Sequence, residues 1–360
     1  MTPVLTHLRR LIAQQGPVSV ASFMQLALGH PEHGYYMRAD PLGAAGDFIT
    51  APEISQMFGE LIGLWSVQIW RDMGCPPVFA LAELGPGRGT LMADALRAAK
   101  HAPDFLAAAQ LHLVETSPVL RAKQLAAIGP RAQWYQTVDA LPELPMLMIA
   151  NEFFDALPVR QFQRAGRGWY ERMVGIDPDT DELVFCQSPE PLVDSSFLPG
   201  AARDVGQGAI MEVCPAAVAI AGELGRRVAV NGGAALIVDY GHGASAPGET
   251  LQAMRGHKFC DVLADPGCAD LTAHVDFAQL AGAARAAGAR VYGPVAQGVF
   301  LNQLGIQQRA EILLRNADAG QAEQIRTAVT RLTGPDQMGD LFKVMAVCHA
   351  SLATPAGFEN

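Results

Sequence analysis

The sequence predicts an α/β fold built on a mainly parallel sheet, with helices on both of its faces. From residue 78 onward, short apolar segments typical of strands alternate with segments of helical periodicity. One of these strands turns into a helix through a glycine-rich loop at residues 85–89. Such alternation is typical of doubly wound sheets, in which crossover helices connect parallel strands.

The segment before this alternation is expected to be helical. Apolar residues at helical spacing predict a first helix over 3–15, and Ser19 is suited to cap a second one over about 19–29. A stretch rich in Gly and Pro follows, over 30–52, which predicts irregular structure. A long apolar helix is then expected from about Glu53 to Met73.

Seven strands are expected in the main sheet, with an insertion after the fourth. The strands are expected at 78–83, 111–115, 132–135, 146–150, 235–239, 290–295 and 341–349. The helices among them are expected at 89–100, 118–128, 215–230, 276–287, 301–316 and 320–332. The insertion is expected to contain short antiparallel strands at 161–163, 168–174 and 183–186, with a turn at 177–181.

These elements divide the chain into four expected parts. They are an N-terminal helical or lid segment (1–77), the first half of the core (78–160), an inserted β subdomain (161–210) and the second half of the core with helical additions (211–360).

Composition excludes several classes of protein. The formal net charge of −10 argues against a general nucleic-acid binder. No apolar run approaches the roughly 18 residues of a membrane span. The N-terminus lacks the apolar core of a signal peptide, and we interpret its first helix as packed in the fold rather than as an organelle presequence.

The six cysteines predict neither a disulfide framework nor a metal site. They form no C-x-x-C pair, so reduced thiols are expected. Cys260 and Cys268 lie in a loop-like stretch with His257 nearby, but no second ligand pair stands at zinc spacing.

The glycine loop is the sharpest local signal. Its sequence from Gly85 to Gly89 is G-x-G-x-G, whereas dinucleotide sites have G-x-G-x-x-G and P-loops continue with Gly-Lys-Ser/Thr. A purely structural turn is one interpretation. With Glu83 two residues earlier, the loop favours a compact cationic nucleoside, S-adenosylmethionine, whose charged end Glu83 can face. The candidate ligands here are Glu83, Gly85, Pro86, Gly87, Gly89 and Thr90.

Polar residues follow the next strands of the sheet. Glu115 ends the second strand and is expected to accept hydrogen bonds from both ribose hydroxyls, with Thr116 beside it; the alternative is a solvated strand end. Asp139 follows the third strand and is suited either to contact the adenine edge or to cap a helix. Asn151 ends the fourth strand, in the crevice where open α/β sheets bind ligands.

Six sequence blocks together resemble the MidA-type S-adenosylmethionine-dependent methyltransferases, relatives of the mitochondrial complex I assembly factor. The blocks are Pro31-Glu32-His33-Gly34-Tyr35-Tyr36, Gly46-Asp47-Phe48-Ile49-Thr50-Ala51-Pro52-Glu53-Ile54-Ser55, Glu83-Leu84-Gly85-Pro86-Gly87-Arg88-Gly89-Thr90, Asn151-Glu152-Phe153-Phe154-Asp155-Ala156-Leu157-Pro158, Asp239-Tyr240-Gly241 and Leu271-Thr272-Ala273-His274-Val275-Asp276-Phe277. The resemblance covers nearly the whole chain, and six blocks in one order are more specific than any one of them.

The resemblance implies a class I methyltransferase fold with an added N-terminal helical segment and an inserted subdomain. It also implies methylation of an arginine in a protein, which in the mitochondrial relatives belongs to a core subunit of respiratory complex I (NADH dehydrogenase). Because no N-terminal extension is present, we expect a bacterial, cytoplasmic member of the family, whose natural acceptor stays open.

An arginine acceptor requires carboxylates that bind its planar guanidinium and localise its charge. Glu152 and Asp155 are the first candidates, because their spacing places both on one side of a loop or helical turn. Asp47 and Glu53 are second candidates, on a segment that is suited to fold over the cofactor as a lid.

The last block and the first block supply further candidates. His274 is expected either to line the acceptor channel or to pack, and Asp276 to cap the following helix. Tyr35 and Tyr36 are expected either to wall the pocket or to pack in the core.

Three other functions compete with this interpretation. They are a non-catalytic assembly chaperone that binds the cofactor, a small-molecule methyltransferase, and a nicotinamide-dependent oxidoreductase. The spacing of the glycine loop disfavours the last of these.

Overall fold

The computed structural model describes residues 2–38 and 49–359. The chain folds into two compact units, each built from three segments. Unit 1 comprises Met1–Phe48, Asp155–Ala219 and Ala244–Gln279, and unit 2 comprises Ile49–Phe154, Ile220–Gly243 and Leu280–Asn360. The domain boundaries predicted at residues 77, 160 and 210 stay predictions, and the two units divide the chain at other residues.

Unit 2 is built on the main sheet, in which all seven expected strands are present. Their order is β15 (Arg290–Ala296), β16 (Phe342–Cys348), β10 (Gly233–His242), β5 (Met146–Asn151), β2 (Phe79–Leu84), β3 (Ala109–Val114) and β4 (Ala132–Tyr135). The strands from β10 to β4 are parallel to one another, and β16 is antiparallel to both of its neighbours. Every residue of β2 and of β5 is buried, which explains why both strands are apolar apart from Glu83 and Asn151 near their carboxyl ends.

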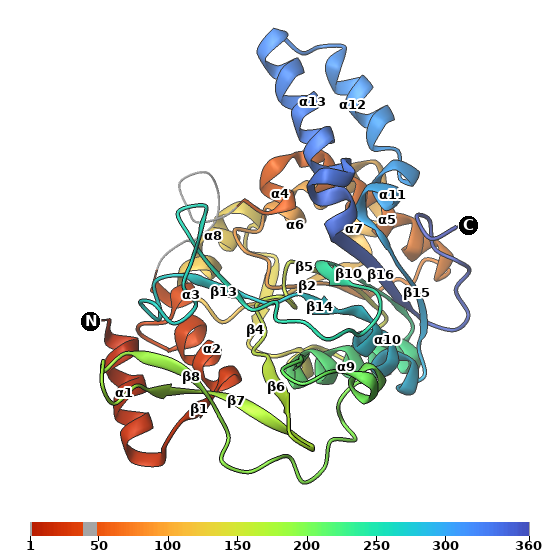
Figure 1. Ribbon diagram of the computed structural model, residues 1–360. Helices are drawn as coiled ribbons and strands as arrows, with labels where there is room; N and C mark the ends of the chain where they lie inside the picture. The colour runs from red at the N-terminus through yellow and green to blue at the C-terminus, as the bar shows by residue number, and fades with distance from the viewer. Residues whose placement is uncertain (1, 39–48, 360) are drawn as a thin grey trace. The chain divides into compact units, whose positions relative to one another are not determined.

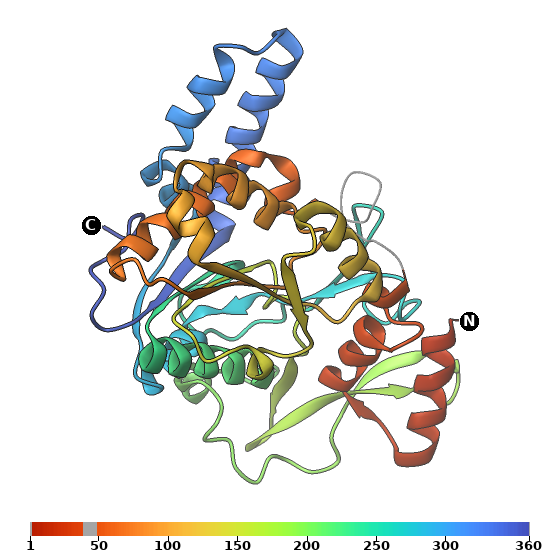
Figure 2. The same ribbon diagram turned by 180° about the vertical axis from the view of Figure 1, so that it is seen from behind.

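Helices cover both faces of this sheet (Figures 1 and 2). On one face lie α5 (Gln56–Asp72) and α6 (Thr90–Ala98), and on the other lie α9 (Pro215–Asn231) and α10 (Phe277–Ala286). The helices α7 (Pro103–Ala108), α8 (Pro118–Ile128), α11 (Gln297–Gln303), α12 (Ile306–Leu314) and α13 (Ala319–Thr333) complete the unit. The doubly wound α/β fold expected from the sequence is therefore confirmed.

The packing of α5 on α6 depends on two glycines. A Cβ atom at Gly63 would lie 2.5 Å from the Cα of Ala95, and one at Gly59 would lie 2.7 Å from the Cβ of Asp94. The two helix backbones are in direct contact at these points. Because α6 begins where the glycine loop ends, this packing fixes the direction in which the loop leaves the sheet.

Two long helices expected in unit 2 are each broken in two. The helix expected over 53–73 is divided into α4 (Ala51–Ile54) and α5, because Ser55 is extended and its hydroxyl accepts a hydrogen bond from the N–H of Met57. The helix expected over 301–316 is divided into α11 and α12 at Gly305, whose φ of 89° places it in the left-handed region. The short helix α7 has no counterpart among the expected elements.

Unit 1 contains the N-terminal helices and the inserted strands. The helices α1 (Pro3–Gln15) and α2 (Val20–Gly29) lie where they were expected, and the Ser19 side chain caps α2. The antiparallel sheet has the order β1 (Val18–Ser19), β7 (Gly168–Ile176), β6 (Arg160–Ala165) and β9 (Ile210–Val213), and β8 (Leu183–Gln187) also pairs with β7. The antiparallel insertion is thus confirmed, and β1 and β9 extend it beyond the expected strands.

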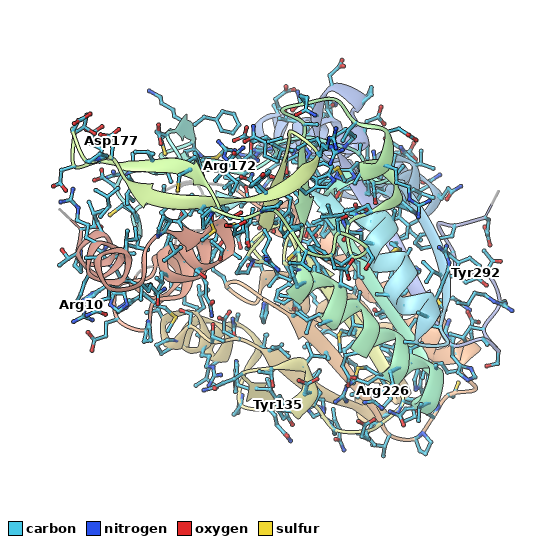
Figure 3. All side chains as sticks on the ribbon, turned by 60° about the horizontal axis from the view of Figure 1, so that its bottom comes forward. Arg10, Tyr135, Arg172, Asp177, Arg226 and Tyr292 are labelled. Carbon is cyan, nitrogen blue, oxygen red and sulfur yellow. The ribbon has the colours of Figure 1, made fainter. Side chains whose placement is uncertain are left out.

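The β7–β8 hairpin ends in the expected turn. Figure 3 shows Arg172 on β7 and Asp177 at the turn. The Asp177 side chain accepts hydrogen bonds from the N–H groups of Asp179 and Thr180, which closes the turn. On the hairpin itself, the Arg172 guanidinium lies 3.8 Å from the centre of the Phe185 ring.

A small three-stranded sheet in unit 1 was not expected. It has the order β12 (Lys258–Cys260), β11 (Gln252–Arg255) and β13 (Asp270–Thr272). The interpretation of the stretch around Cys260 as a loop was therefore wrong, because Cys260 pairs with Ala253 at the end of β12. No helix within the described ranges is long and apolar enough to span a membrane.

Candidate cofactor and active site

The glycine loop connects β2 to α6 and depends on its three glycines. Gly85, Gly87 and Gly89 have φ values of 59°, 55° and 84°, in the left-handed region that favours glycine. A Cβ atom at Gly85 would lie 2.9 Å from Cδ2 of Phe153. The loop therefore packs against the segment that follows β5, and a side chain at Gly85 would separate the two.

Glu83 lies one residue before the end of β2 and is deeply buried. Glu83 is 3% exposed, and its Oε2 has no hydrogen-bond partner among the described residues. Burial raises the pKa of Glu83 to about 8. A buried carboxyl group with an unsatisfied oxygen next to a glycine loop fits a ligand that carries a positive charge.

Glu115 follows β3 and is held by two donors. Its Oε1 accepts a hydrogen bond from the N–H of Ser117 at 2.8 Å, and its Oε2 accepts one from Nε2 of Gln124 at 3.0 Å. Burial raises the pKa of Glu115, and the hydrogen bonds offset this rise only in part. The residue is only 8% exposed, so the alternative of a solvated strand end is wrong. The neighbouring Thr116 is exposed.

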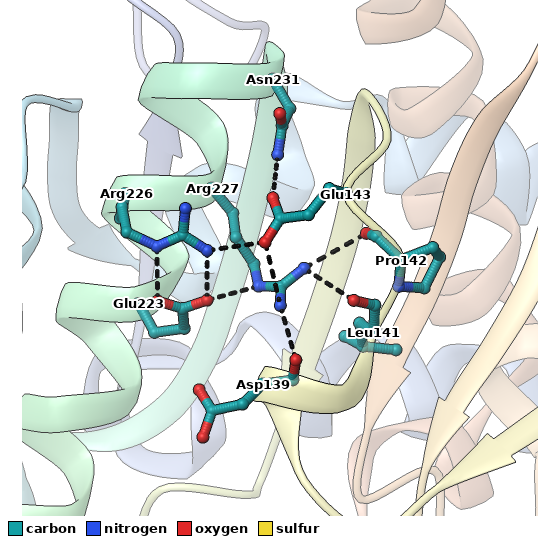
Figure 4. A network of polar contacts seen from close by, with 8 residues as sticks. All are labelled: Asp139, Leu141, Pro142, Glu143, Glu223, Arg226, Arg227 and Asn231. Carbon is teal, nitrogen blue, oxygen red and sulfur yellow. Dashed lines mark hydrogen bonds and ion pairs between the residues drawn. The ribbon is translucent and has the colours of Figure 1, made fainter.

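Asp139 follows β4 inside a short 3₁₀ turn (Val138–Ala140). The turn has Thr137 at its N-cap position and no capping hydrogen bond from a side chain, so the alternative of a helix cap at Asp139 was wrong. Figure 4 shows the Asp139 carboxylate pointing away from the buried Arg227, while the Asp139 carbonyl oxygen accepts a hydrogen bond from it.

Arg227 on α9 anchors the chain between β4 and β5 (Figure 4). Its guanidinium donates to the carbonyl oxygens of Asp139, Leu141 and Pro142 at 3.0–3.2 Å, and to Oε1 of Glu223 at 2.6 Å. Arg227 is 1% exposed, so these partners replace water for a fully buried cation. The segment that carries Asp139 is thereby fixed to α9.

The chain after β5 is arranged around Glu152. This residue has a φ of 49°, which is uncommon for a residue with a side chain. Its Oε1 accepts hydrogen bonds from the N–H of Ala51 at 2.9 Å and from Nδ2 of Asn151 at 3.1 Å. Asp239 is fully buried in β10, the strand beside β5 in the sheet. Its Oδ2 accepts hydrogen bonds from the N–H groups of Phe153 and Phe154.

The helix α4 is joined to the start of α6 through Glu53. Its Oε1 accepts a hydrogen bond from the hydroxyl of Thr90 at 2.5 Å, and its Oε2 forms an ion pair with Arg88 at 3.3 Å. Glu53 and Thr90 thus contact each other. Asp47, the other candidate expected on this segment, lies outside the described residues.

The remaining candidates belong to unit 1. Asp276 caps α10, as expected, because its Oδ1 accepts hydrogen bonds from the N–H groups of Ala278 and Gln279. His274 donates its backbone N–H to the hydroxyl of Thr250. Asp155 is buried, and its carbonyl oxygen accepts a hydrogen bond from the N–H of Ala273.

Tyr36 and the buried Asp270 form a further polar cluster in unit 1. The Tyr36 hydroxyl donates to Oδ1 of Asp270 at 2.7 Å. Burial, together with the negative charges of Asp270 and Asp155, raises the pKa of Tyr36. Tyr35 is buried in the hydrophobic core, as its packing interpretation expected.

Within unit 2, Gln124 connects the glycine loop to Glu115, and Phe153 brings the loop against the end of β5. Sequence reasoning assigned no role to Gln124, Arg227, Asp239 or Asp270. A lone Gln or Arg on a helix gives no pattern, although the spacing of Gln124 from Leu120 places it on the buried face of α8.

Comparison with known proteins places this geometry in a family. The family model of S-adenosyl-L-methionine-dependent methyltransferases matches residues 61–295, which is well over half of the chain. The chain belongs to this family. It is a class I methyltransferase with S-adenosyl-L-methionine as its cofactor, and the buried carboxyl of Glu83 and the glycine loop fit that cationic ligand.

This methyltransferase matches individual relatives over nearly its whole length. It is 41% identical to protein arginine methyltransferase NDUFAF7 of Mus musculus, a mitochondrial protein, over 96% of this chain and 84% of the relative. It is 38% identical to the protein of the same name from Homo sapiens, over 96% of this chain and 83% of the relative.

A solved structure shares the fold. The crystal structure of a protein from Burkholderia thailandensis, bound to S-adenosyl-homocysteine, superposes with a TM-score of 0.83 at 30% sequence identity. The match covers 98% of this chain and 93% of that one.

Proposed function

We propose that this methyltransferase transfers a methyl group to an arginine side chain of a protein. The names of the mouse and human relatives support an arginine acceptor. The observation in this chain that carries the proposal is the conformation of Glu152. A non-glycine residue at positive φ costs free energy, and such residues gather at functional sites.

Glu152 is suited to bind a guanidinium. Its carboxylate is held by the N–H of Ala51 and the side chain of Asn151, and the chain after it is anchored on Asp239. A carboxylate fixed in this way can accept hydrogen bonds from the planar fork of an arginine. It would localise positive charge on the nitrogen that does not react, which leaves the other nitrogen more nucleophilic.

Positioning is the main catalytic contribution expected of the chain. When bound, S-adenosyl-L-methionine supplies an electrophilic methyl group on a sulfonium. Fixing two reactants in the reacting geometry accounts for roughly 7–11 kcal/mol of barrier reduction. Asp155, Asp47 and His274 are proposed as further acceptor-side residues.

The proposed cofactor ligands lie in unit 2. Glu83 would face the charged end of the cofactor, and the backbone of the glycine loop would approach it closely. Glu115 would accept hydrogen bonds from the ribose, and Asp139 would contact the adenine edge. The complete proposed set is Glu83, Gly85, Pro86, Gly87, Gly89, Thr90, Glu115, Thr116, Asp139 and Asn151.

For the acceptor, we propose a subunit of NADH dehydrogenase, the respiratory complex I, in the cytoplasm of a bacterium. This proposal rests on the family resemblance of the sequence blocks. It competes with a small-molecule acceptor and with a chaperone role that needs no turnover.

One experiment separates these outcomes. The protein is incubated with methyl-labelled S-adenosylmethionine and either a cell lysate or purified complex I subunits, and labelled products are identified by mass spectrometry. Label on an arginine of one protein supports the proposal. Label only on small molecules, or no label at all, contradicts it.

A further inference from the structure

Gln124 is a fully buried polar residue between two parts of the proposed cofactor site. It lies on α8, whose buried residues are Leu120 and Gln124, and it is 0% exposed. A buried amide needs hydrogen-bond partners for both its nitrogen and its oxygen. The partners of Gln124 therefore indicate what this side chain holds in place.

Three contacts fix the Gln124 amide. Its Nε2 donates to the carbonyl oxygen of Gly87 at 2.8 Å and to Oε2 of Glu115 at 3.0 Å. Its Oε1 accepts a hydrogen bond from Nε1 of Trp134 at 2.8 Å. The indole nitrogen can only donate, so it must face the amide oxygen, and the NH₂ group must face Gly87 and Glu115.

These contacts couple the glycine loop to the acid after β3. The loop carbonyl at Gly87 and the carboxylate of Glu115 both accept from one nitrogen, so neither can move without breaking a hydrogen bond to the buried Gln124 side chain. The backbone of α8 is also close to the loop, since a Cβ atom at Gly89 would lie 3.3 Å from the Cα of Gln124. Each carboxylate oxygen of Glu115 has a second lone pair that can accept from a ribose hydroxyl.

We propose that Gln124 is a positioning residue for the cofactor, which orients the Glu115 carboxylate toward the ribose while holding the glycine loop at Gly87. This inference rests on the proposed role of Glu115. In this proposal Gln124 acts on the cofactor through Glu115 and the glycine loop, without a contact of its own.

The test measures ribose recognition rather than affinity alone. Calorimetry gives the affinities of the full-length protein for S-adenosylhomocysteine and for its 2′,3′-dideoxy analogue. We expect the wild type to bind the analogue at least about tenfold more weakly, because Glu115 loses its hydroxyl donors. Gln124→Met keeps the volume of the side chain but removes its donors, so we expect it to bind S-adenosylhomocysteine more weakly and to discriminate less between the two ligands.

Leu120→Val is the matched control on the same buried face of α8. It alters packing but no hydrogen bond of the amide, so it should keep the wild-type discrimination. Wild-type discrimination in Gln124→Met overturns the proposal for Gln124 alone. Wild-type discrimination in Glu115→Ala overturns the proposed ribose role of Glu115, and the role of Gln124 with it.

Gln124→Glu keeps the proposal testable if the Met variant does not fold. A protonated carboxyl group can still donate to Glu115, whereas an ionised one repels it. The affinity of this variant for S-adenosylhomocysteine, relative to the wild type, should therefore fall as pH rises through the pKa of the introduced carboxyl group, which NMR titration of the variant locates. An affinity ratio that stays constant over the pH range in which this carboxyl group ionises overturns the proposal.

Discussion

Replacement of Glu83 by Gln tests whether the carboxyl group before the glycine loop is neutral in the cofactor-free protein. Burial raises its pKa from 4.5 to about 8, and its Oε2 has no partner among the described residues. A neutral amide of the same shape avoids the cost of burying a charge. We therefore expect Glu83→Gln to become more stable than the wild type as pH rises.

The magnitude follows from proton linkage. When folding raises the pKa of an acid, the folded state keeps the proton up to a higher pH than the unfolded state does. The free energy of unfolding is therefore highest below the unfolded pKa and falls as pH rises toward the folded pKa. For Glu83 the window runs from about pH 4.5 to about pH 8. At about 1.4 kcal/mol per pH unit, reduced near each pKa where titration is incomplete, the free energy of unfolding of the wild type should fall by about 3–4 kcal/mol relative to Glu83→Gln between about pH 5 and about pH 8.

The assay is chemical denaturation of the cofactor-free wild type and variant in a pH series. Calorimetry in buffers of different ionisation enthalpy adds a second measurement. Near pH 7, binding of S-adenosylmethionine should release a proton from the wild type, because its positive charge favours the ionised carboxylate, and less from the variant. A stability difference that does not change with pH would refute the claim that Glu83 is buried in its neutral form.

Two further predictions concern the loop and the network of Figure 4. Gly87→Val places a β-branched residue at a φ of 55° and should weaken S-adenosylhomocysteine binding by more than about 100-fold in calorimetry. Gly129→Val is its control, because Gly129 also has a positive φ but lies at the end of α8, so an equal loss of affinity there would contradict the assignment. Arg227→Met should lower the free energy of unfolding by about 3–5 kcal/mol, since it leaves buried carbonyls without their donor. Arg226→Met removes ion pairs at the surface and should change stability little in the same denaturation assay; a similar loss in both variants would show that burial does not matter here.

The sheet and its glycine loop could be predicted because their signals are local. The buried strands are almost entirely apolar, and the loop needs glycine at positions 85, 87 and 89 for its backbone conformation. The break between α4 and α5 was missed because Ser55 interrupts an apolar periodicity without a Gly or Pro to mark it. The strands β11, β12 and β13 have three or four residues each, and only their pairing with one another identifies them as a sheet.

The candidate site was predictable where a residue type at a strand end implies its chemistry. Glu83, Glu115 and Glu152 were identified in this way, although their assigned roles stay proposals. The sequence does not reveal which side chains hold these acids in place. Gln124 contacts Gly87, 37 residues away, and Asp239 contacts Phe153, 86 residues away, and such pairs have no spacing signature.

The central claim is that Glu152 acts on an arginine acceptor, and methylarginine formation by Glu152→Gln tests it most directly. The variant keeps an oxygen that can accept from Ala51 and Asn151, so the loop after β5 and the affinity for S-adenosylhomocysteine should be retained. Acid hydrolysis of the labelled acceptor protein then gives the rate of methylarginine formation. The account predicts a rate at least about 100-fold below that of the wild type, because the carboxylate no longer binds the guanidinium. A wild-type rate in Glu152→Gln would contradict it.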